Sequence, residues 1–223
     1  MFHLVLDLEM CRVPKHYRSK AYKYANEIIQ IGAVLLDEEF EIIGKLNQFV
    51  HPEHGVLDYC ISSLTGIENS QLKNAPLLKE ALEHMIAWLG DREYDVYQWS
   101  NTDHSQLLHE IKSKGLESEK INSFMEEDRW IDYQAVFGKR YDFTRLVSLK
   151  ETLIYCNIDI EGRLHDGLDD AINTSKIIKL LETDKEFALY EYEREEVEEV
   201  EEHPILNFCL GDLFANLQFE CFA

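Results

Sequence analysis

Two carboxylates lie close together near the start of the chain. Asp7 and Glu9 are two positions apart in the first predicted strand, which the apolar run of residues 2–8 indicates. Side chains two apart project from the same face of a strand, so both carboxylates would share one face of a sheet. Buried together they would need a cation, whereas at a strand end water would solvate them. The pair alone leaves both interpretations open.

A third carboxylate follows a later strand. Asp103 comes after the predicted strand at residues 95–99 and begins the predicted helix at residues 103–112. An acid in the first turn of a helix is common and favourable without any further role. In α/β sheets, however, residues just past the strand ends converge in one crevice. Asp103 could therefore reach the same crevice as Asp7 and Glu9.

The last group lies in the segment His165-Asp166-Gly167-Leu168-Asp169-Asp170. Asp170 is expected to begin a helix over residues 171–181, with His165 in the loop before it, so that the two side chains meet at one site. We expect Asp166 and Asp169 to cap the helix or to be solvated. The alternative for the whole group is an acidic helix start beside a surface histidine.

Four carboxylates and one histidine suit the hydrolysis of a phosphodiester. Two divalent cations about 3.5–4 Å apart can stabilise the attacking and leaving oxygens together. Mg²⁺ and Mn²⁺ prefer oxygen ligands, chiefly carboxylates and water. A histidine can take the proton from the attacking water.

The pattern of elements predicts an α/β fold. Strands are expected at residues 2–8, 27–36, 41–50, 95–99 and 130–133, and helices at residues 76–89, 103–112, 149–158 and 171–181. The first three strands would form a continuous antiparallel unit. This order favours a mixed five-stranded sheet with helices on both faces, in three layers.

Together these residues resemble the three motifs of the DEDDh 3′-to-5′ exonucleases. Asp7-x-Glu9, Asp103, and His165 with Asp170 five positions later match in order and spacing, over residues 1–181 as the exonuclease domain. The resemblance implies a ribonuclease-H-like fold and two ions, Mg²⁺ or Mn²⁺. Asp7, Glu9 and Asp170 would bind the first ion, Asp7 and Asp103 the second, and His165 would be the general base.

The resemblance also implies where a terminal nucleotide would bind. Met10 and Cys11 would line its pocket, and Leu64, Thr65 and Ile67 would pack near its base or sugar. Segments such as residues 27–36 and 162–170 are similar to the branch that trims the 3′ ends of histone mRNA and small interfering RNA. This favours single-stranded RNA as the partner and nucleoside 5′-monophosphates as products.

Two other interpretations remain. A non-catalytic regulatory or protein-binding member of the same fold would need no metal to act. An HD-type phosphohydrolase would use His165-Asp166, but it needs further histidines on preceding helices and leaves the strand residues Asp7 and Glu9 without a role.

The charge of the chain runs against nucleic-acid binding. The net charge is −21, so the overall field repels a polyanion. Residues 12–23 are an exception, since they contain five Lys or Arg and no acid, with tyrosines interleaved. Arg12 and Lys15, in this segment, could follow the phosphates of a single strand; the alternative is a solvated loop.

The composition sets the remaining expectations. No apolar run approaches the ~20 residues that a membrane span needs, so no membrane association is expected. An odd number of cysteines, 5, without a Cys-x-x-Cys pair argues against a disulfide framework and favours the cytoplasm. Residues 182–223 form an extension, first acidic and then apolar, that could pack on the domain, form a homodimer contact or bind a protein partner.

Overall fold

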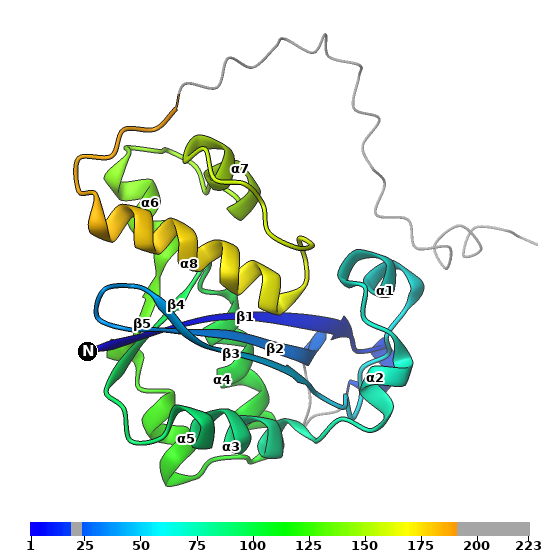
Figure 1. Ribbon diagram of the computed structural model, residues 1–223. Coiled ribbons are helices and arrows are strands. Elements are labelled where there is room, and N and C mark those ends of the chain that lie inside the picture. Colours follow the sequence, from blue (N-terminus) through cyan, green and yellow to red (C-terminus); the bar gives the residue numbers. More distant parts are fainter. Residues whose placement is uncertain (19–23, 191–223) are drawn as a thin grey trace, which may run out of the picture. The chain divides into compact units, whose positions relative to one another are not determined.

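A mixed five-stranded sheet forms the centre of the protein. The computed structural model describes residues 1–18 and 24–190. The strands are β1 (Phe2–Arg12), β2 (Asn26–Leu36), β3 (Ile42–Phe49), β4 (Tyr94–Gln98) and β5 (Trp130–Asp132). Their order is β3-β2-β1-β4-β5, with β1, β2 and β3 antiparallel and β4 and β5 parallel to β1 (Figure 1).

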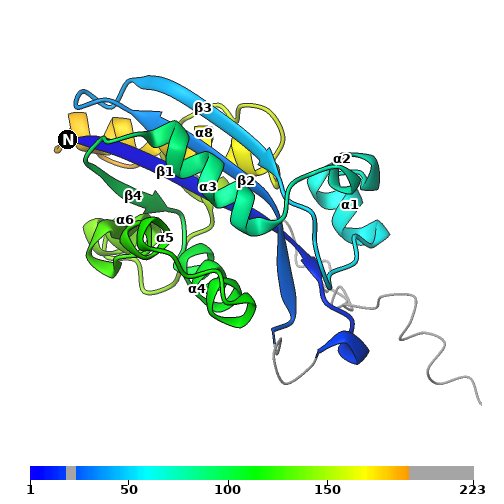
Figure 2. The ribbon, with the colours of Figure 1, turned by 90° about the horizontal axis from the view of Figure 1, so that it is seen from below.

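Helices cover both faces of this sheet. On one face lie α3 (Leu78–Leu89), α4 (Thr102–Lys114) and α5 (Glu119–Phe124); on the other lie α6 (Tyr133–Arg140), α7 (Leu149–Tyr155) and α8 (Gly167–Thr183). Figures 1 and 2 show these layers, with α1 (Tyr59–Thr65) and α2 (Asn69–Lys73) beside the far end of β1. The predicted three-layer fold is therefore confirmed.

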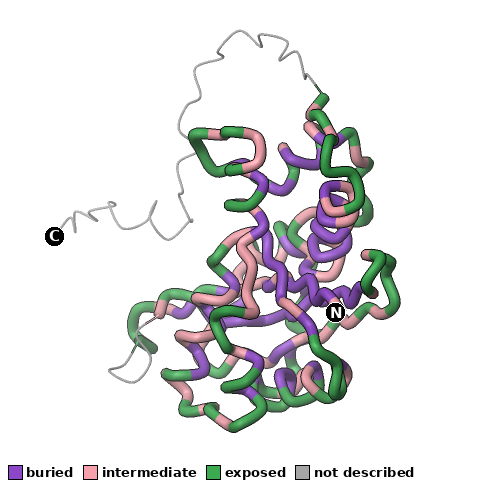
Figure 3. The backbone as a smooth tube through the Cα atoms, turned by 90° about the vertical axis from the view of Figure 1, so that its left-hand side faces the viewer, coloured by how far each residue is buried: buried purple, intermediate pink, exposed green. Residues whose placement is uncertain are grey.

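The alternation of β1 separates the two cores. Leu4, Leu6 and Leu8 are buried against α3 to α5, while Val5, between them, is buried against α6 to α8. In Figure 3 the buried stretches lie mostly in the interior, along the central strands, and the exposed stretches lie mostly at the periphery. Asp7 and Glu9 continue the Val5 side, so the strand directs both carboxylates toward α8.

The predicted strands all form, but four short helices were not predicted. The structure adds α1, α2, α5 and α6, which have five to eight residues each. Such helices span at most about two turns, too few to show a 3.6-residue period in the sequence. Capping by Asp58, Ser118 and Asp132 begins α1, α5 and α6.

The compact unit of the structure comprises Met1–Tyr190. Arg140 of α6 donates hydrogen bonds to the carbonyls of Leu181, Asp184 and Lys185, and so ties the chain after α8 to the domain. The rest of the predicted extension, residues 191–223, lies outside the described residues. Among the described residues, no helix is long and apolar enough to cross a membrane.

The start of α8 lies unusually close to β2. A Cβ atom added to Gly32 would lie 2.0 Å from the carbonyl carbon of Gly167, the first residue of α8. The buried side chain of Gln30 accepts a hydrogen bond from the Gly167 N–H at 3.0 Å and donates one to Asp166 at 3.2 Å. Two glycines and one amide therefore fix the helix directly on the sheet backbone.

A buried ionic cluster ties β2 to α4. Lys114 lies within ion-pair distance of Glu27 and Glu110, and both carboxylates are fully buried. Glu110 accepts from the Ile28 N–H at 2.7 Å, and Glu27 accepts from the backbone N–H groups of residues 53–55. The cluster thus joins the strand, the helix and the loop leading to α1.

We predict that Gly32→Ala destabilises the protein by about 1–3 kcal/mol, because the added methyl group forces α8 away from the sheet. Urea unfolding measures this change. Gly138→Ala is the matched control: nothing lies within 4 Å of its added Cβ, and it sits within α6, so stability should rise by about 0.5–1 kcal/mol. Equal stability of Gly32→Ala and the wild type would contradict the close contact.

We predict that Lys114→Met lowers the free energy of unfolding at neutral pH by roughly 3–5 kcal/mol, since it leaves two buried carboxylates without their cation. Burial opposes ionisation of Glu27, but the hydrogen bond and charge of Lys114 outweigh it and lower its pKa. That stabilisation exists above the ordinary carboxyl pKa and is lost as the pH falls through the lowered value. The deficit of the variant should therefore shrink in acid.

The exposed pair of Lys45 and Glu161 supplies the control for this experiment. Lys45→Met should change the stability by less than about 1 kcal/mol at any pH. A deficit of Lys114→Met that stays constant between neutral and acid pH would show that packing, and not charge, holds the cluster.

Candidate active site

The unequal lengths of β1 and β4 open the site. The two strands pair only as far as Val5 and Tyr97, so the edge of β1 beyond Val5 has no strand beside it. The chain turns there into α4, and the carboxylate of Asp103, in its first turn, accepts a hydrogen bond from the Leu8 N–H. The Asp103 carboxylate thus accepts a hydrogen bond from β1 where a residue of β4 would have done so had that strand continued. This brings Asp103 next to Asp7 and Glu9.

The start of α8 brings the last carboxylate from the other face. Asp7 pairs with Gly32 across β1 and β2, and Gly32 is the residue on which α8 rests. Asp170, one turn into α8, is therefore carried over the Asp7–Glu9 side of β1. Asp166 caps the helix, accepting from the N–H groups of Leu168 and Asp169, as expected from the sequence.

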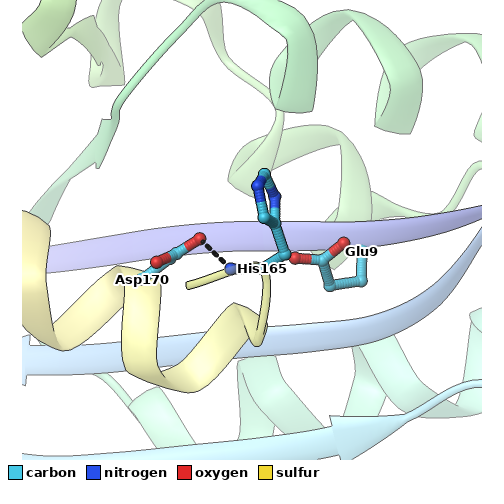
Figure 4. A group of neighbouring side chains, drawn as sticks. All are labelled: Glu9, His165 and Asp170. Carbon is cyan, nitrogen blue, oxygen red and sulfur yellow. Dashed lines mark hydrogen bonds between the residues drawn. The ribbon is translucent and has the colours of Figure 1, made fainter. Parts of the chain in front are cut away.

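Glu9, Asp170 and His165 come together at this point. One ligand atom of each lies within 4.8 Å of those of the other two. Figure 4 shows the carboxylates of Glu9 and Asp170 on either side of the His165 backbone, whose N–H donates to Asp170 at 2.9 Å. Asp170 is buried, Glu9 half-buried and His165 exposed, so the cluster opens to solvent at the histidine.

The crowding of carboxylates raises their pKa values. Burial, followed by the charges of Asp170 and Asp103, raises the pKa of Glu9 to about 8. Burial raises the pKa of Asp103 to about 8 and that of Asp170 to about 6. Burial and the charges of these same neighbours raise the pKa of Asp7 well above its ordinary value. Four ionised carboxylates are thus unstable here without added positive charge.

The residues fit divalent cations. Oδ1 of Asp170 is buried without a hydrogen-bond partner in the part of the chain that the structure describes. Such an orphaned oxygen is costly unless something binds it, and it lies beside Glu9 in a cluster of oxygen ligands. Hard cations such as Mg²⁺ and Mn²⁺ take such ligands.

The loop of His165 is held in a strained conformation. His165 has φ +65°, in the left-handed region that non-glycine residues seldom adopt. Asn173 of α8 exchanges two hydrogen bonds of 2.9 Å with the Glu161 backbone, and Arg163 donates to the Ser63 carbonyl in α1. These contacts hold the loop of His165 against α8 and join it to α1.

The residues expected to bind the substrate differ in how far they are exposed. Cys11, Thr65 and Ile67 are at most 2% exposed and pack in or beside the core under α1. Their place at a terminal nucleotide stays a prediction. Leu64, in contrast, is 47% exposed on α1.

The other three residues lie at the end of β1 or just after it. Met10 is half-buried and packs against the core on the opposite face from Glu9. Arg12 and Lys15 are exposed. Residues 19–23, the second part of the basic segment, lie outside the described residues.

Several residues that build the site were not singled out in the sequence. Gln30 and Gly32 of β2, together with Gly167 and Asn173 of α8, set where Asp170 and His165 lie. The one available signal was Gln30, with Gly32 two positions later, in the otherwise apolar run of residues 28–36. A polar amide in a fully buried strand needs partners, which could not be identified from sequence alone.

Comparisons with known proteins agree with this geometry. Residues 4–178 match the family model described as "Exonuclease" (RNase_T). The chain is 30% identical over 183 residues to 3'-5' exoribonuclease 1 of Rattus norvegicus, which covers 76% of this chain and 51% of that protein. It is 24% identical over 186 residues to 3'-5' exonuclease eri1 of Schizosaccharomyces pombe, covering 71% of this chain and 61% of that protein.

Solved structures share the fold. One is the nuclease domain of 3'hExo, a DEDDh family member, bound to rAMP, with a TM-score of 0.68, 24% identity, and coverage of 85% of this chain and 96% of that one. Another is a 3'-exonuclease in a structure of the 3'-end specific recognition of histone mRNA stem-loop, with a TM-score of 0.71, 23% identity, and 84% coverage of both chains. The chain spans about half the length of the first curated relatives. By its family match over most of its length, the chain belongs to the exonuclease family.

Proposed function

We propose that the protein is a metal-dependent 3′-to-5′ exonuclease that acts on single-stranded RNA and releases nucleoside 5′-monophosphates. The observation that carries the proposal is the convergence of Glu9, Asp170 and His165 from separate segments, with a buried oxygen of Asp170 left unpaired among the described residues. The family match supports the reaction class, and the names of the relatives support RNA.

Each residue has a distinct part in the proposed reaction. Asp7, Glu9 and Asp170 would hold one cation, and Asp7 would hold a second together with Asp103, directly or through water. Two such ions, Mg²⁺ or Mn²⁺, supply stabilisation of the attacking and leaving oxygens. His165, exposed at the mouth of the cluster, accepts the proton of the attacking water. The oxygen of that water bonds to phosphorus as the phosphorus–oxygen bond to the upstream 3′ oxygen breaks. The freed 3′ oxygen takes a proton from solvent, and the terminal nucleotide leaves with its 5′ phosphate.

The substrate contacts follow from the exposed residues. Leu64 on α1 offers apolar surface for the terminal nucleoside, next to the loop that Arg163 ties to α1. Arg12 and Lys15 offer positive charge at the end of β1 in an otherwise acidic protein. We propose the cytoplasm as the site of action, and keep a homodimer or protein partner for residues 182–223 as a prediction.

We predict that Asp7→Asn lowers turnover roughly 10³-fold or more, because several kcal/mol of metal-ion stabilisation are lost. The same change should preserve or raise the unfolding midpoint in EDTA, since it removes one of four crowded carboxylates. Turnover is measured with 3′-labelled RNA in Mn²⁺, next to the exposed control Asp159→Asn. Near wild-type turnover of Asp7→Asn would refute the two-ion site. A protein that acts without any added metal ion would support the alternative of a non-catalytic regulatory member of the fold.

We predict that His165→Asn lowers kcat by about 10²–10⁴-fold while leaving Mn²⁺ affinity unchanged. Asparagine tolerates the left-handed backbone of this position but cannot accept the proton at neutral pH. Rates and Mn²⁺ binding are measured on the same preparation. A parallel loss of Mn²⁺ affinity would show that His165 is a metal ligand, a role that its place beside Glu9 and Asp170 also permits.

A further inference from the structure

A hollow of about 570 Å³ lies at the amino end of β4, away from the carboxylate cluster. It is formed by the end of α3, the loop before β4, α5 and Arg129 just before β5; α3 and α5 lie side by side in Figure 1. Tyr94, in its wall, pairs with Phe2 at the start of β1, whereas Glu9 lies seven positions after Phe2. At about 3.3 Å per residue this separation is roughly 20 Å, so a small ligand in the hollow cannot touch the cluster.

The lining of this hollow carries an excess of positive charge. Arg92, Lys120 and Arg129 contribute cations, and Asp91 is the one acid among the described residues that form it. In a chain with 43 acidic and 22 basic residues, a carboxylate could easily be supplied for each cation. The hollow instead keeps a net positive charge, which attracts anions.

Aromatic rings hold two of these cations in place. The guanidinium of Arg92 lies 5.6 Å from the centroid of the Phe2 ring and donates a hydrogen bond to the Leu89 carbonyl at 2.6 Å. The guanidinium of Arg129 lies 5.8 Å from the centroid of the Tyr94 ring. A ring face orients a guanidinium without neutralising its charge. Both arginines are therefore positioned at the hollow with their charge still available.

The contacts of these cations with carboxylates are few. Arg129 pairs with the exposed Glu126 at 3.2 Å, but an exposed pair of this kind contributes little, so a dianion can replace it. In the described part of the chain, neither Arg92 nor Lys120 has a carboxylate within ion-pair distance. Ser123, exposed on the same wall, adds a hydroxyl donor. Two guanidinium groups, an ammonium and a hydroxyl match the several acceptor oxygens of a phosphate.

We propose that this hollow is a second nucleotide-binding site, which recognises a phosphate group through Arg92, Lys120 and Arg129. Its volume exceeds what a bare phosphate fills and lies within the range of small-molecule sites, so a nucleoside can bind beside the phosphate, against Ile86 and Phe124. The phosphate belongs either to a free nucleoside monophosphate or to an RNA strand, and the experiment separates these two sources. The site uses none of the catalytic carboxylates, so it goes beyond the exonuclease proposal.

The test measures binding by calorimetric titration at low salt in EDTA, where the metal-free carboxylate cluster does not attract phosphates. Uridine 5′-monophosphate should bind, and uridine should bind at least about 10-fold more weakly, since it lacks the charged hydrogen-bond acceptor. Arg92→Gln and Lys120→Gln should each weaken binding of the monophosphate by about 10-fold, the loss of one hydrogen bond to a charged group. Lys79→Gln is the matched control, because Lys79 is exposed on α3 outside the hollow.

The source of the phosphate follows from a second titration with a single-stranded RNA of about ten uridines. Tighter binding of the strand than of the monophosphate, lost in the same two variants, would assign the site to RNA; equal or weaker binding would assign it to free nucleotides. Lys120 is exposed, so Lys120→Gln tests the charge without disturbing the core.

Two results would overturn the site. One is the absence of binding of both the monophosphate and the strand. The other is binding that Arg92→Gln and Lys120→Gln leave unchanged, including binding that only Arg12→Gln weakens. Neither result bears on turnover of labelled RNA in Mn²⁺, by which the exonuclease proposal stands or falls separately.

Discussion

The contact between the start of α8 and the middle of β2 is the constraint on which the site depends. Gly32 lies opposite Asp7 in the sheet, and Gly167 begins the helix that carries Asp170. With a side chain at either position the helix would stand farther from the sheet, and Asp170 would no longer reach the carboxylates of β1. The geometry of a charged site is thus set by the smallest uncharged residues in its neighbourhood.

This contact also explains how the fold tolerates the electrostatic repulsion among the four carboxylates of the site. Four carboxylates forced into one crevice oppose folding, and their raised pKa values measure that cost. Backbone packing, the Gln30 amide and the buried Lys114 cluster compensate from outside the crevice. On the proposed function, the carboxylates are therefore in place before a cation binds, and its binding would relieve electrostatic repulsion rather than create structure.

Features that follow a periodic pattern or a motif could be predicted from the sequence, whereas close contacts between distant segments could not. Apolar alternation placed the strands, and motif spacing placed Asp103 and Asp170. The five-residue α2 left no periodic signal, and the sequence could not show that Cys11 turns inward toward the core below α1. Nor could it show that Gln30 is paired with a helix start 137 positions away. A contact between single side chains far apart in the sequence leaves no local pattern. The residues that position the site could therefore be identified only in the structure.

The acidity of the chain and a nucleic-acid substrate are compatible once the two kinds of contact are separated. Lysine and arginine bind phosphates through a field that a net charge of −21 opposes. On the proposed function, a cation held between the carboxylates would carry its own positive charge to the cleaved phosphate. Such an enzyme would gain little from long-range electrostatic steering, and its affinity would be concentrated on the few nucleotides at the 3′ end.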